Sequence, residues 1–482
     1  MTTYRHRALL DHSRSEVTSW YARPGAVVRL SPPWSTRVIS GPSDGLEVGS
    51  RTELRMGPQW ADGLVPGAFP VRPGARWLAE HTEFRPGESF TDVMVRGPLR
   101  SWKHRHDFLD AGTDGAEVAD TVDYELPSAL RGRFLRGEDR LEAELDRVFA
   151  YRTDQTRADL DFAASLRRVP GAPWEPLKIA VAGSSGLVGT QLTALLRGAG
   201  HQVFRLERRT GYSGELGAGR IAWDPTQHRL DPAKLIGIDA VINLAGEPIF
   251  GAFTAKHRRA LLESRLNATE TIVEAMREAA DRGGPGALIN ASASGYYGHD
   301  AGEVDEDSAP GEDFLAGLCF EWEKAALRAE EFGTRVVTVR TGLVLSAAGG
   351  LLAAQLPLYF GGAGGPLGGG NQWQPWISVD DMAQIYALAA ISPRLSGPVN
   401  AAAPNPVRQR DFARSLGEVV HRPSRLPTPR QAPRLLLGRQ ATEELALSSA
   451  AMVPRVLTDA GYVFRFPELD GALRHTLGRT VA

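Results

Sequence analysis

Three glycines at regular spacing form the clearest chemical motif of the 482-residue chain. Gly183, Gly186 and Gly189 stand between an apolar segment, 177–182, and a helical run that begins near Thr190. A strand followed by such a turn and a helix lets backbone N–H groups approach a pyrophosphate at the helix N-terminus. The motif predicts a dinucleotide-binding loop, and a purely structural glycine turn is the alternative. The loop consists of Gly183, Ser184, Ser185, Gly186, Leu187, Val188 and Gly189.

The segment HQVFRL, 201–206, predicts the second strand, and Glu207, Arg208 and Arg209 follow it. A carboxylate at this place would hold the ribose 2′-OH of NAD, whereas arginine would accommodate the 2′-phosphate of NADP. Two arginines against one acid favour NADP over NAD, with Arg208 and Arg209 as the phosphate ligands. A solvated charge run is compatible with either cofactor.

Hydroxyl groups gather after the predicted strand 287–291. Ser292 and Ser294 come first, and Tyr296 and Tyr297 follow before Gly298. Ligands bind at the carboxyl ends of parallel strands, so we expect these hydroxyls to face the nicotinamide. The alternative for both tyrosines is packing with a solvated hydroxyl.

Two further groups of polar residues could take part in chemistry. An acidic run, whose members are Glu303, Asp305, Glu306 and Asp307, could supply an acid or base, but a solvated loop is the commoner role of such a run. His104 and His106 share one face of a predicted strand, while Asp107 points away. No third metal ligand is evident in the sequence, so we expect packing or cavity lining there and no metal site.

The elements around these residues divide the chain into parts. Short alternating segments and then a helix, 141–160, occupy the first part, and the Pro-rich stretch VPGAPWEP predicts a linker. Beyond it, apolar strands at 240–244, 287–291 and 335–339 alternate with helical stretches at 254–281 and 313–331, as a doubly wound parallel sheet requires. The charge-free stretch between Thr341 and Val379 is rich in glycine and predicts a buried loop over a pocket.

Six segments together resemble the extended short-chain dehydrogenase/reductase superfamily, and more narrowly its bacterial epimerase-like branch. They are GSSGLVG, VINLAG (241–246), SRLNATETIVEA (264–275), NASASGYYG (290–298), RTGLVL (340–345) and WISVDD (376–381). Residues 401–482 resemble the C-terminal domain of unknown function of this branch, and residues 4–165 resemble a START-like helix-grip domain. The resemblance implies an α/β Rossmann-type domain at 177–400, with a small C-terminal α/β extension at 401–482. It also implies an α+β START-like domain at 1–166, with a deep cavity, joined by a linker at 167–176.

The resemblance also implies site residues. Ser292 or Ser294 would take the serine role and Tyr297 would line the substrate pocket, so these three are the candidate catalytic residues. Further cofactor contacts would come from Asn243, Ala245, Gly246 and Asn267, although a local backbone hydrogen bond is an equal alternative for the two asparagines.

One feature of the superfamily is missing. Its redox members use Tyr-x-x-x-Lys for proton transfer. The five lysines are Lys103, Lys178, Lys234, Lys256 and Lys324, and the residues four positions before them are Leu99, Trp174, Leu230, Ala252 and Phe320. The chain therefore lacks the pair; Phe320 with Lys324 is its nearest relic, and an alignment could instead place Leu315 or Leu318 there.

Composition restricts the functions that remain. A net charge of −2 gives no footprint for nucleic acid, and a single cysteine, Cys319, excludes an intramolecular disulfide. No signal peptide or membrane span is evident, so we expect a cytoplasmic protein. Two interpretations stay open: an NAD(P)-dependent oxidoreductase or epimerase acting on a small-molecule substrate, and a regulatory NAD(P)-binding protein whose START-like domain binds an apolar ligand. By resemblance, the helices at 254–281 and 313–331 could form a homodimer.

Overall fold

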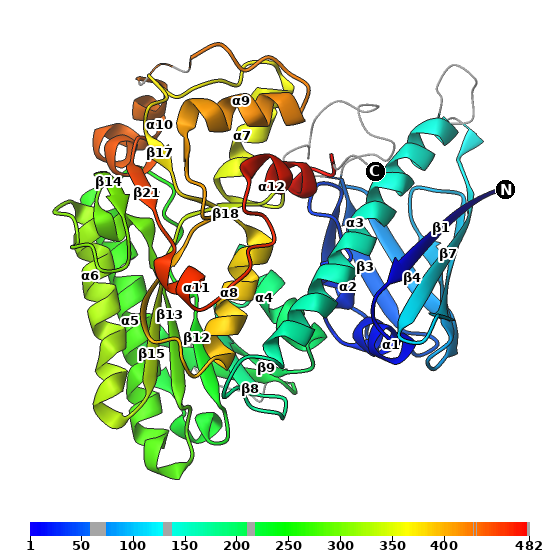
Figure 1. Cartoon of the computed structure of the whole chain (residues 1–482), viewed down its shortest axis with the longest axis horizontal. Helices are drawn as coiled ribbons and strands as arrows, with labels where there is room; N and C mark the ends of the chain where they lie inside the picture. Colours follow the sequence, from blue (N-terminus) through cyan, green and yellow to red (C-terminus); the bar gives the residue numbers. More distant parts are fainter. Residues whose placement is uncertain (58–73, 129–136, 210–216, 428, 430, 480–482) are drawn as a thin grey trace.

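The computed structural model contains two large sheets, each with its own helices (Figure 1). It describes residues 1–482 apart from 58–73, 129–136, 210–216, 428, 430 and 480–482. No helix in these described ranges has the length and apolarity that a membrane span requires.

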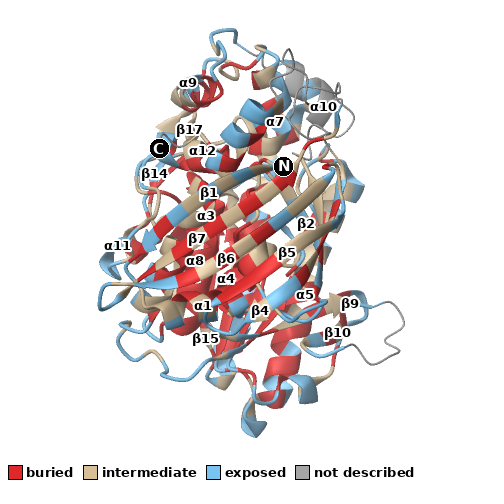
Figure 2. Cartoon of the chain, turned by 90° about the vertical axis from the view of Figure 1, so that its right-hand side faces the viewer, coloured by how far each residue is buried: buried red, intermediate tan, exposed pale blue. Residues whose placement is uncertain are grey.

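The first sheet is antiparallel and is crossed by one long helix. Its seven strands lie in the order β1-β7-β6-β5-β4-β3-β2. Their bounds are β1 Thr2–Leu10, β2 Thr36–Ser40, β3 Arg51–Met56, β4 Arg76–Arg85, β5 Ser89–Arg96, β6 Ser101–Ala111 and β7 Gly115–Glu125. Buried residues alternate with half-buried ones along much of β6 and the whole of β7, which gives the sheet one inner face (Figure 2). Helices α1 (Arg14–Ala22), α2 (Ala26–Arg29) and α3 (Gly137–Leu166) accompany this sheet.

The second sheet confirms the predicted Rossmann-type architecture. Its order is β11-β10-β9-β8-β12-β13-β15-β19, and every neighbouring pair is parallel except β10 with β11. The bounds are β8 Lys178–Ala182, β9 Gln202–Arg208, β10 Arg220–Asp224, β11 Arg229–Leu230, β12 Ala240–Asn243, β13 Ala287–Ala293, β15 Arg335–Thr341 and β19 Gly397–Ala401. These strands carry runs of buried apolar residues because both faces of the sheet are covered.

Helices cover both faces of this sheet. One core joins its strands to α4 (Leu187–Gly198) and α8 (Val379–Ile391), and Phe162 and Leu166 of α3 contribute to the same core. On the other face lie α5 (Ala255–Ala279) and α6 (Phe314–Leu327). The prediction of helices at 254–281 and 313–331 is thus right to within a few residues at each end.

The glycine-rich stretch after β15 is more ordered than the loop that we predicted. It forms β16 (Leu343–Leu345), α7 (Gly350–Phe360), β17 (Trp373–Gln374) and β18 (Trp376–Ser378). The helix forms because the glycines flank a run of good helix formers, and its Leu352 and Leu356 are buried in a third core.

The last part of the chain packs back on the second sheet's domain. It contains β20 (Val407–Arg408), α9 (Gln409–Val419), α10 (Gln431–Ala441), β21 (Ser449–Met452), α11 (Arg455–Asp459) and α12 (Leu469–Thr476). Strand β21 pairs in parallel with β14 (Asp300–Val304), a strand from the middle of the chain. The C-terminal segment is therefore part of the same folded body.

Candidate functional site

The glycine loop lies between the end of β8 and the start of α4, and two of its glycines are required by backbone packing. Gly183 has φ +75°, and a Cβ there would lie 2.7 Å from the carbonyl carbon of Leu244. A Cβ on Gly189 would lie 2.3 Å from the carbonyl oxygen of Gly183. Neither position therefore admits a side chain without moving the backbone.

Gly186 differs from these two. It is the N-cap of α4, it is exposed together with Ser185, and an added Cβ would meet nothing closer than 3.3 Å. The N-terminal N–H groups of α4 thus stand behind an accessible loop tip, which is the arrangement that binds anions. Ser184 is buried and accepts a hydrogen bond of 3.2 Å from Nε of Arg205, whereas Leu187 and Val188 are half-buried.

At the end of β9, Glu207 differs from Arg208 and Arg209 in its ion pairing. Glu207 lies 3.5 Å from Nε of Arg220 on β10, so its carboxylate already has a cationic partner. Arg208 and Arg209 are exposed, and within the described part of the chain neither side chain forms an ion pair. Two unpaired guanidinium groups at this edge of the sheet can bind a phosphate.

The side chain of Asn243 forms the local hydrogen bonds that were the alternative to a cofactor contact. Its side chain is fully buried and donates hydrogen bonds to Oγ1 of Thr269 (3.0 Å) and Oδ1 of Asn290 (2.8 Å). Its own Oδ1 accepts the backbone N–H of Ala245 at 3.1 Å. Asn243 therefore shapes the loop that contains Ala245 and Gly246, because its amide is already saturated by protein groups.

The remaining cofactor candidates lie around this loop. Gly246 packs against Arg265 of α5, where an added Cβ would lie 3.3 Å from Cζ. Asn267 is half-buried on the same helix, and its carbonyl oxygen accepts a hydrogen bond from Thr271. Both residues stay predictions as cofactor contacts.

Ser292 and Tyr297 belong to one buried polar network. Ser292 donates a hydrogen bond of 2.6 Å to Oε1 of Glu323. Arg340 binds both carboxylate oxygens of Glu323 at 3.0 Å and also donates to the hydroxyl of Tyr297 at 3.0 Å. That hydroxyl in turn donates to Oδ1 of Asn400 at 2.6 Å.

The network bears on the prediction that Ser292 and Tyr297 are catalytic groups. Their exposed fractions are 3% and 4%, and each hydroxyl is already used inside the protein. Burial raises the pKa of Tyr297 to about 12, whereas a catalytic tyrosine base needs a lowered pKa. Both residues therefore hold the ends of β13, β15 and β19 together.

Helix α6 contains the positions where the superfamily has its tyrosine and lysine. Phe320 and Lys324 are exposed, whereas Cys319 and Glu323 are buried toward the sheet. Burial raises the pKa of the Cys319 thiol to about 12, so it cannot replace the missing tyrosine as a base. The sequence contains one sign of this network. Arg340 directly follows the largely apolar segment VVTV, so it extends a strand that is expected to be buried.

Ser294 is the one predicted catalytic hydroxyl that stays outside the network. It begins the 3₁₀ turn Ser294–Tyr297 after β13 and is half-buried. Tyr296 packs its ring under the guanidinium of Arg340, whose Cζ is 3.5 Å from the ring centroid. The packing alternative therefore holds for Tyr296.

The acidic run anchors the C-terminal segment. Asp305 and Asp307 both form ion pairs with Arg455. Glu306 is buried, and its Oε1 accepts the backbone N–H groups of Asn400 (3.0 Å) and Val456 (3.2 Å). Neither the predicted acid/base role nor the solvated-loop alternative describes Glu306.

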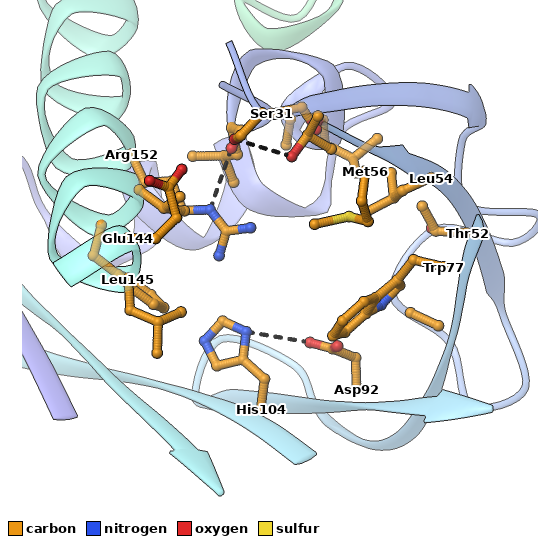
Figure 3. A pocket seen from close by; sticks show the side chains of 18 of the residues that line it. Ser31, Thr52, Leu54, Met56, Trp77, Asp92, His104, Glu144, Leu145 and Arg152 are labelled. Atoms are coloured by element: carbon orange, nitrogen blue, oxygen red, sulfur yellow. Dashed lines mark hydrogen bonds and ion pairs between the residues drawn. The ribbon is translucent and has the colours of Figure 1, made fainter. Parts of the chain in front are cut away.

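A cavity of about 820 Å³ lies between the first sheet and α3. Its walls are largely apolar, and Trp77, Leu54, Met56 and Leu145 face it (Figure 3). His104 and His106 also line it, on the strand face that we predicted. Neighbouring strands add Asp92 and Asp120 beside them, which the spacing within one strand could not show.

Comparison with known proteins finds two family models that match separate parts of the chain. The sequence model of the NAD dependent epimerase/dehydratase family matches residues 179–401, and that of a domain of unknown function, DUF1731, matches residues 428–476. An epimerase family protein of Mycobacterium bovis is 41% identical over 307 residues, which cover 62% of this chain and 98% of that protein.

Two solved structures extend the comparison. The nucleoside-diphosphate sugar epimerase of Corynebacterium glutamicum is 32% identical with a TM-score of 0.76, and the match covers 99% of this chain and 90% of that one. Human epimerase family protein SDR39U1, solved with NADPH, is 32% identical with a TM-score of 0.56, and the match covers 62% of this chain and 99% of that one. The similarity to the Corynebacterium protein thus includes the first sheet.

Proposed function

The chain belongs to the NAD-dependent epimerase/dehydratase family, and from this membership we propose that it binds NADP(H) and transfers hydride to or from a small molecule. The observation that carries the proposal is the exposed tip of the Gly183–Gly189 loop at the N-terminus of α4. Backbone N–H groups there would hold the pyrophosphate.

The preference for NADP(H) is supported by the end of β9. Glu207 is engaged by Arg220, so it is a poor partner for a ribose 2′-OH, whereas Arg208 and Arg209 are available for a 2′-phosphate. The human relative solved with NADPH supports the same preference.

The nicotinamide, when bound, supplies hydride transfer. Among the predicted hydroxyls, Ser294 is the one free to orient a substrate oxygen or a water molecule, because Ser292 and Tyr297 are committed to the buried network. The Corynebacterium relative carries the name of a nucleoside-diphosphate sugar epimerase, so we propose this class as the first substrates to test.

Titration of the purified protein with NADPH and with NADH, followed by calorimetry, tests the cofactor site. Gly186→Asp places a carboxylate at the loop tip, where it repels the pyrophosphate, while Gly186→Ala is the matched control, because a Cβ fits there. We expect tighter binding of NADPH than of NADH, and at least about a tenfold loss in Gly186→Asp, equivalent to about 1.4 kcal/mol. Equal affinities for NADPH in wild type, Gly186→Asp and Gly186→Ala would contradict the proposal.

A second function is favoured by the burial of Ser292 and Tyr297 together with the apolar cavity. In this alternative NADP(H) is an effector and the first domain, which we propose to be START-like, binds an apolar ligand. Incubation with UDP-glucose and UDP-galactose separates the two functions. With NADP⁺ present, sugar interconversion or formation of NADPH supports the enzyme, and binding of NADP(H) without either supports the regulatory protein.

A further inference from the structure

Four ionisable side chains meet on the inner face of the first sheet. His104 and His106 are two residues apart on β6, so they share that face. The strand register places Asp92 of β5 directly opposite His104, and Asp120 of β7 directly opposite His106. Side chains opposite each other on one face of a sheet are near neighbours. The two histidines are therefore held between two carboxylates that come from different strands.

Three of these side chains converge on one point at the cavity. Nδ1 of His104 and Nε2 of His106 lie 3.5 Å and 3.7 Å from the same oxygen, Oδ2 of Asp92. One ligand atom of each residue lies within 4.8 Å of those of the other two. Ligand atoms bound at about 2.1 Å around a tetrahedral ion are about 3.4 Å apart, so small movements suffice to enclose an ion. Figure 3 shows Asp92 and His104 pointing toward one another at the cavity wall.

The fourth side chain lies behind the imidazoles. Nε2 of His104 forms a hydrogen bond of 3.0 Å with Oδ1 of Asp120, and Nδ1 of His106 is 2.8 Å from the same oxygen, outside hydrogen-bond geometry. A carboxylate that engages the distal nitrogen of a histidine fixes the ring and directs the other nitrogen toward a metal. Asp120 lies next to the distal nitrogen of both rings and forms a hydrogen bond with that of His104.

The charges at the cluster suit a cation. His104 and Asp120 are buried, and the side chain of Asp92 is only 16% exposed. Two buried carboxylates are costly to desolvate unless cations compensate them. Arg152 and Glu144 reach the same cavity from α3, and four further arginines, Arg23, Arg147, Arg422 and Arg479, line it as well.

We propose that Asp92, His104 and His106 bind one divalent transition-metal ion at the wall of this cavity, with Asp120 orienting both imidazoles. Two histidines and one carboxylate suit zinc(II) or iron(II), and three protein ligands leave a position open. That position faces the 820 Å³ cavity, so the ion can bind an oxygen of a largely apolar small molecule. The metal site lies in the first domain and does not depend on the nucleotide loop.

Zinc titration of the full chain, after removal of metals with a chelator, tests the site. We expect one zinc ion per chain by calorimetry. Cobalt(II) bound in its place should give the visible absorption of a four-coordinate site. Asp92→Asn and the double variant His104→Ala/His106→Ala should each weaken zinc binding at least about a hundredfold, and Asp120→Asn about ten- to a hundredfold.

Matched controls separate ligation from folding. His12→Ala removes a histidine of the same domain that pairs with Asp161 outside the cavity, and Asp107→Asn changes an aspartate on the other face of β6. Both should bind zinc like wild type. Asp92→Asn keeps the shape of the side chain, so its thermal unfolding checks that loss of zinc binding is not loss of structure. Absence of zinc binding to the wild type, or equal binding by wild type and Asp92→Asn, would overturn the site.

Discussion

The hydroxyl of Tyr297 donates to Asn400 and accepts from Arg340, so both of its hydrogen-bonding functions are used within the fold. Arg340 is itself held by both oxygens of Glu323, and only 3% of its surface is exposed. Removal of one member of such a buried network leaves its partners unsatisfied. Tyr297 therefore contributes to the stability of the fold through this network.

Tyr297→Phe should lower the free energy of unfolding by about 1–3 kcal/mol, because Arg340 and Asn400 each lose a partner. Its affinity for NADPH should stay that of the wild type. Urea unfolding and NADPH titration measure the two effects, and Tyr296→Phe serves as the control for loss of a tyrosine hydroxyl. Unchanged stability together with lost NADPH binding would show that Tyr297 contacts the cofactor.

Breaking the ion pair between Glu323 and Arg340 should lower the free energy of unfolding more than removing the hydroxyl of Tyr297 does. Glu323→Gln leaves the Arg340 guanidinium buried without its bidentate carboxylate, so we expect a loss of about 3–5 kcal/mol in the free energy of unfolding. Glu321→Gln, on the exposed side of α6 where Glu321 pairs with Lys324, should change stability by less than about 1 kcal/mol. Similar losses in the two variants would contradict a buried network.

The packing of β8 and α4 determines which glycines of the nucleotide loop are essential. The turn from β8 into α4 brings Gly183 against Leu244 and Gly189 against Gly183, while Gly186 stays open. The spacing of the three residues is regular, but their surroundings are not. The loop thus combines two glycines needed for packing with one at the accessible tip.

Gly189→Ala should therefore disturb the loop more than Gly186→Ala. The new Cβ of Gly189→Ala would lie 2.3 Å from the carbonyl oxygen of Gly183, so the backbone of the loop must move. We expect a loss of NADPH affinity of at least about tenfold for Gly189→Ala and near wild-type affinity for Gly186→Ala. Calorimetric titration compares them, and equal affinities would contradict the packing argument.

A buried cluster of charged residues helps to join the first sheet's domain to the second. Arg29 of α2 binds Asp159 of α3 through two nitrogens and also binds Asp380 of α8 at 2.7 Å. The backbone of Gly25, just before α2, packs so closely on Ala194 of α4 that an added Cβ would lie 2.5 Å from its carbonyl oxygen. The first domain is therefore docked firmly on the second (Figure 1).

The C-terminal segment closes the same junction. Arg465 lies 3.7 Å from Asp380 and donates to Gln155 of α3, while His475 lies 3.5 Å from Asp380. Three regions of the chain thus converge on one carboxylate. The wall of the 820 Å³ cavity likewise includes Leu356 of α7 and Leu477 near the C-terminus, so the cavity is completed by other parts of the chain.

Arg29→Met should undock the first domain. The substitution leaves Asp159 and Asp380 buried without their shared cation, and we expect a loss of about 3–5 kcal/mol in the free energy of unfolding. Limited proteolysis in the linker 167–176 should become faster. Arg14→Met, which breaks an exposed pair with Asp110, is the control and should change neither property.

The buried carboxylate of Asp380 should make the stability of the protein depend on pH. Burial would raise the pKa of Asp380, but Arg29, Arg465 and His475 hold it well below its usual value of 3.8. A lowered pKa in the folded state stabilises the protein above the unfolded pKa, and this contribution is lost as pH falls through the folded pKa. The stability difference between wild type and Asp380→Asn should thus be constant above about pH 5 and shrink below about pH 4. Denaturant unfolding at several pH values measures it, and a pH-independent difference would contradict this linkage.

The parallel sheet can be predicted from the residues alone, and so can the glycine loop, the absence of Tyr-x-x-x-Lys and the shared face of His104 and His106. Each of these depends on residues close together in the chain, where periodicity and spacing are visible. The contacts of Tyr297 with Arg340 and Asn400 could not be predicted in this way, nor could the positions of Asp92 and Asp120 beside the two histidines. These partners come from other strands, up to 103 residues away for Tyr297, and their pairing depends on strand order and register, which spacing within one strand does not specify.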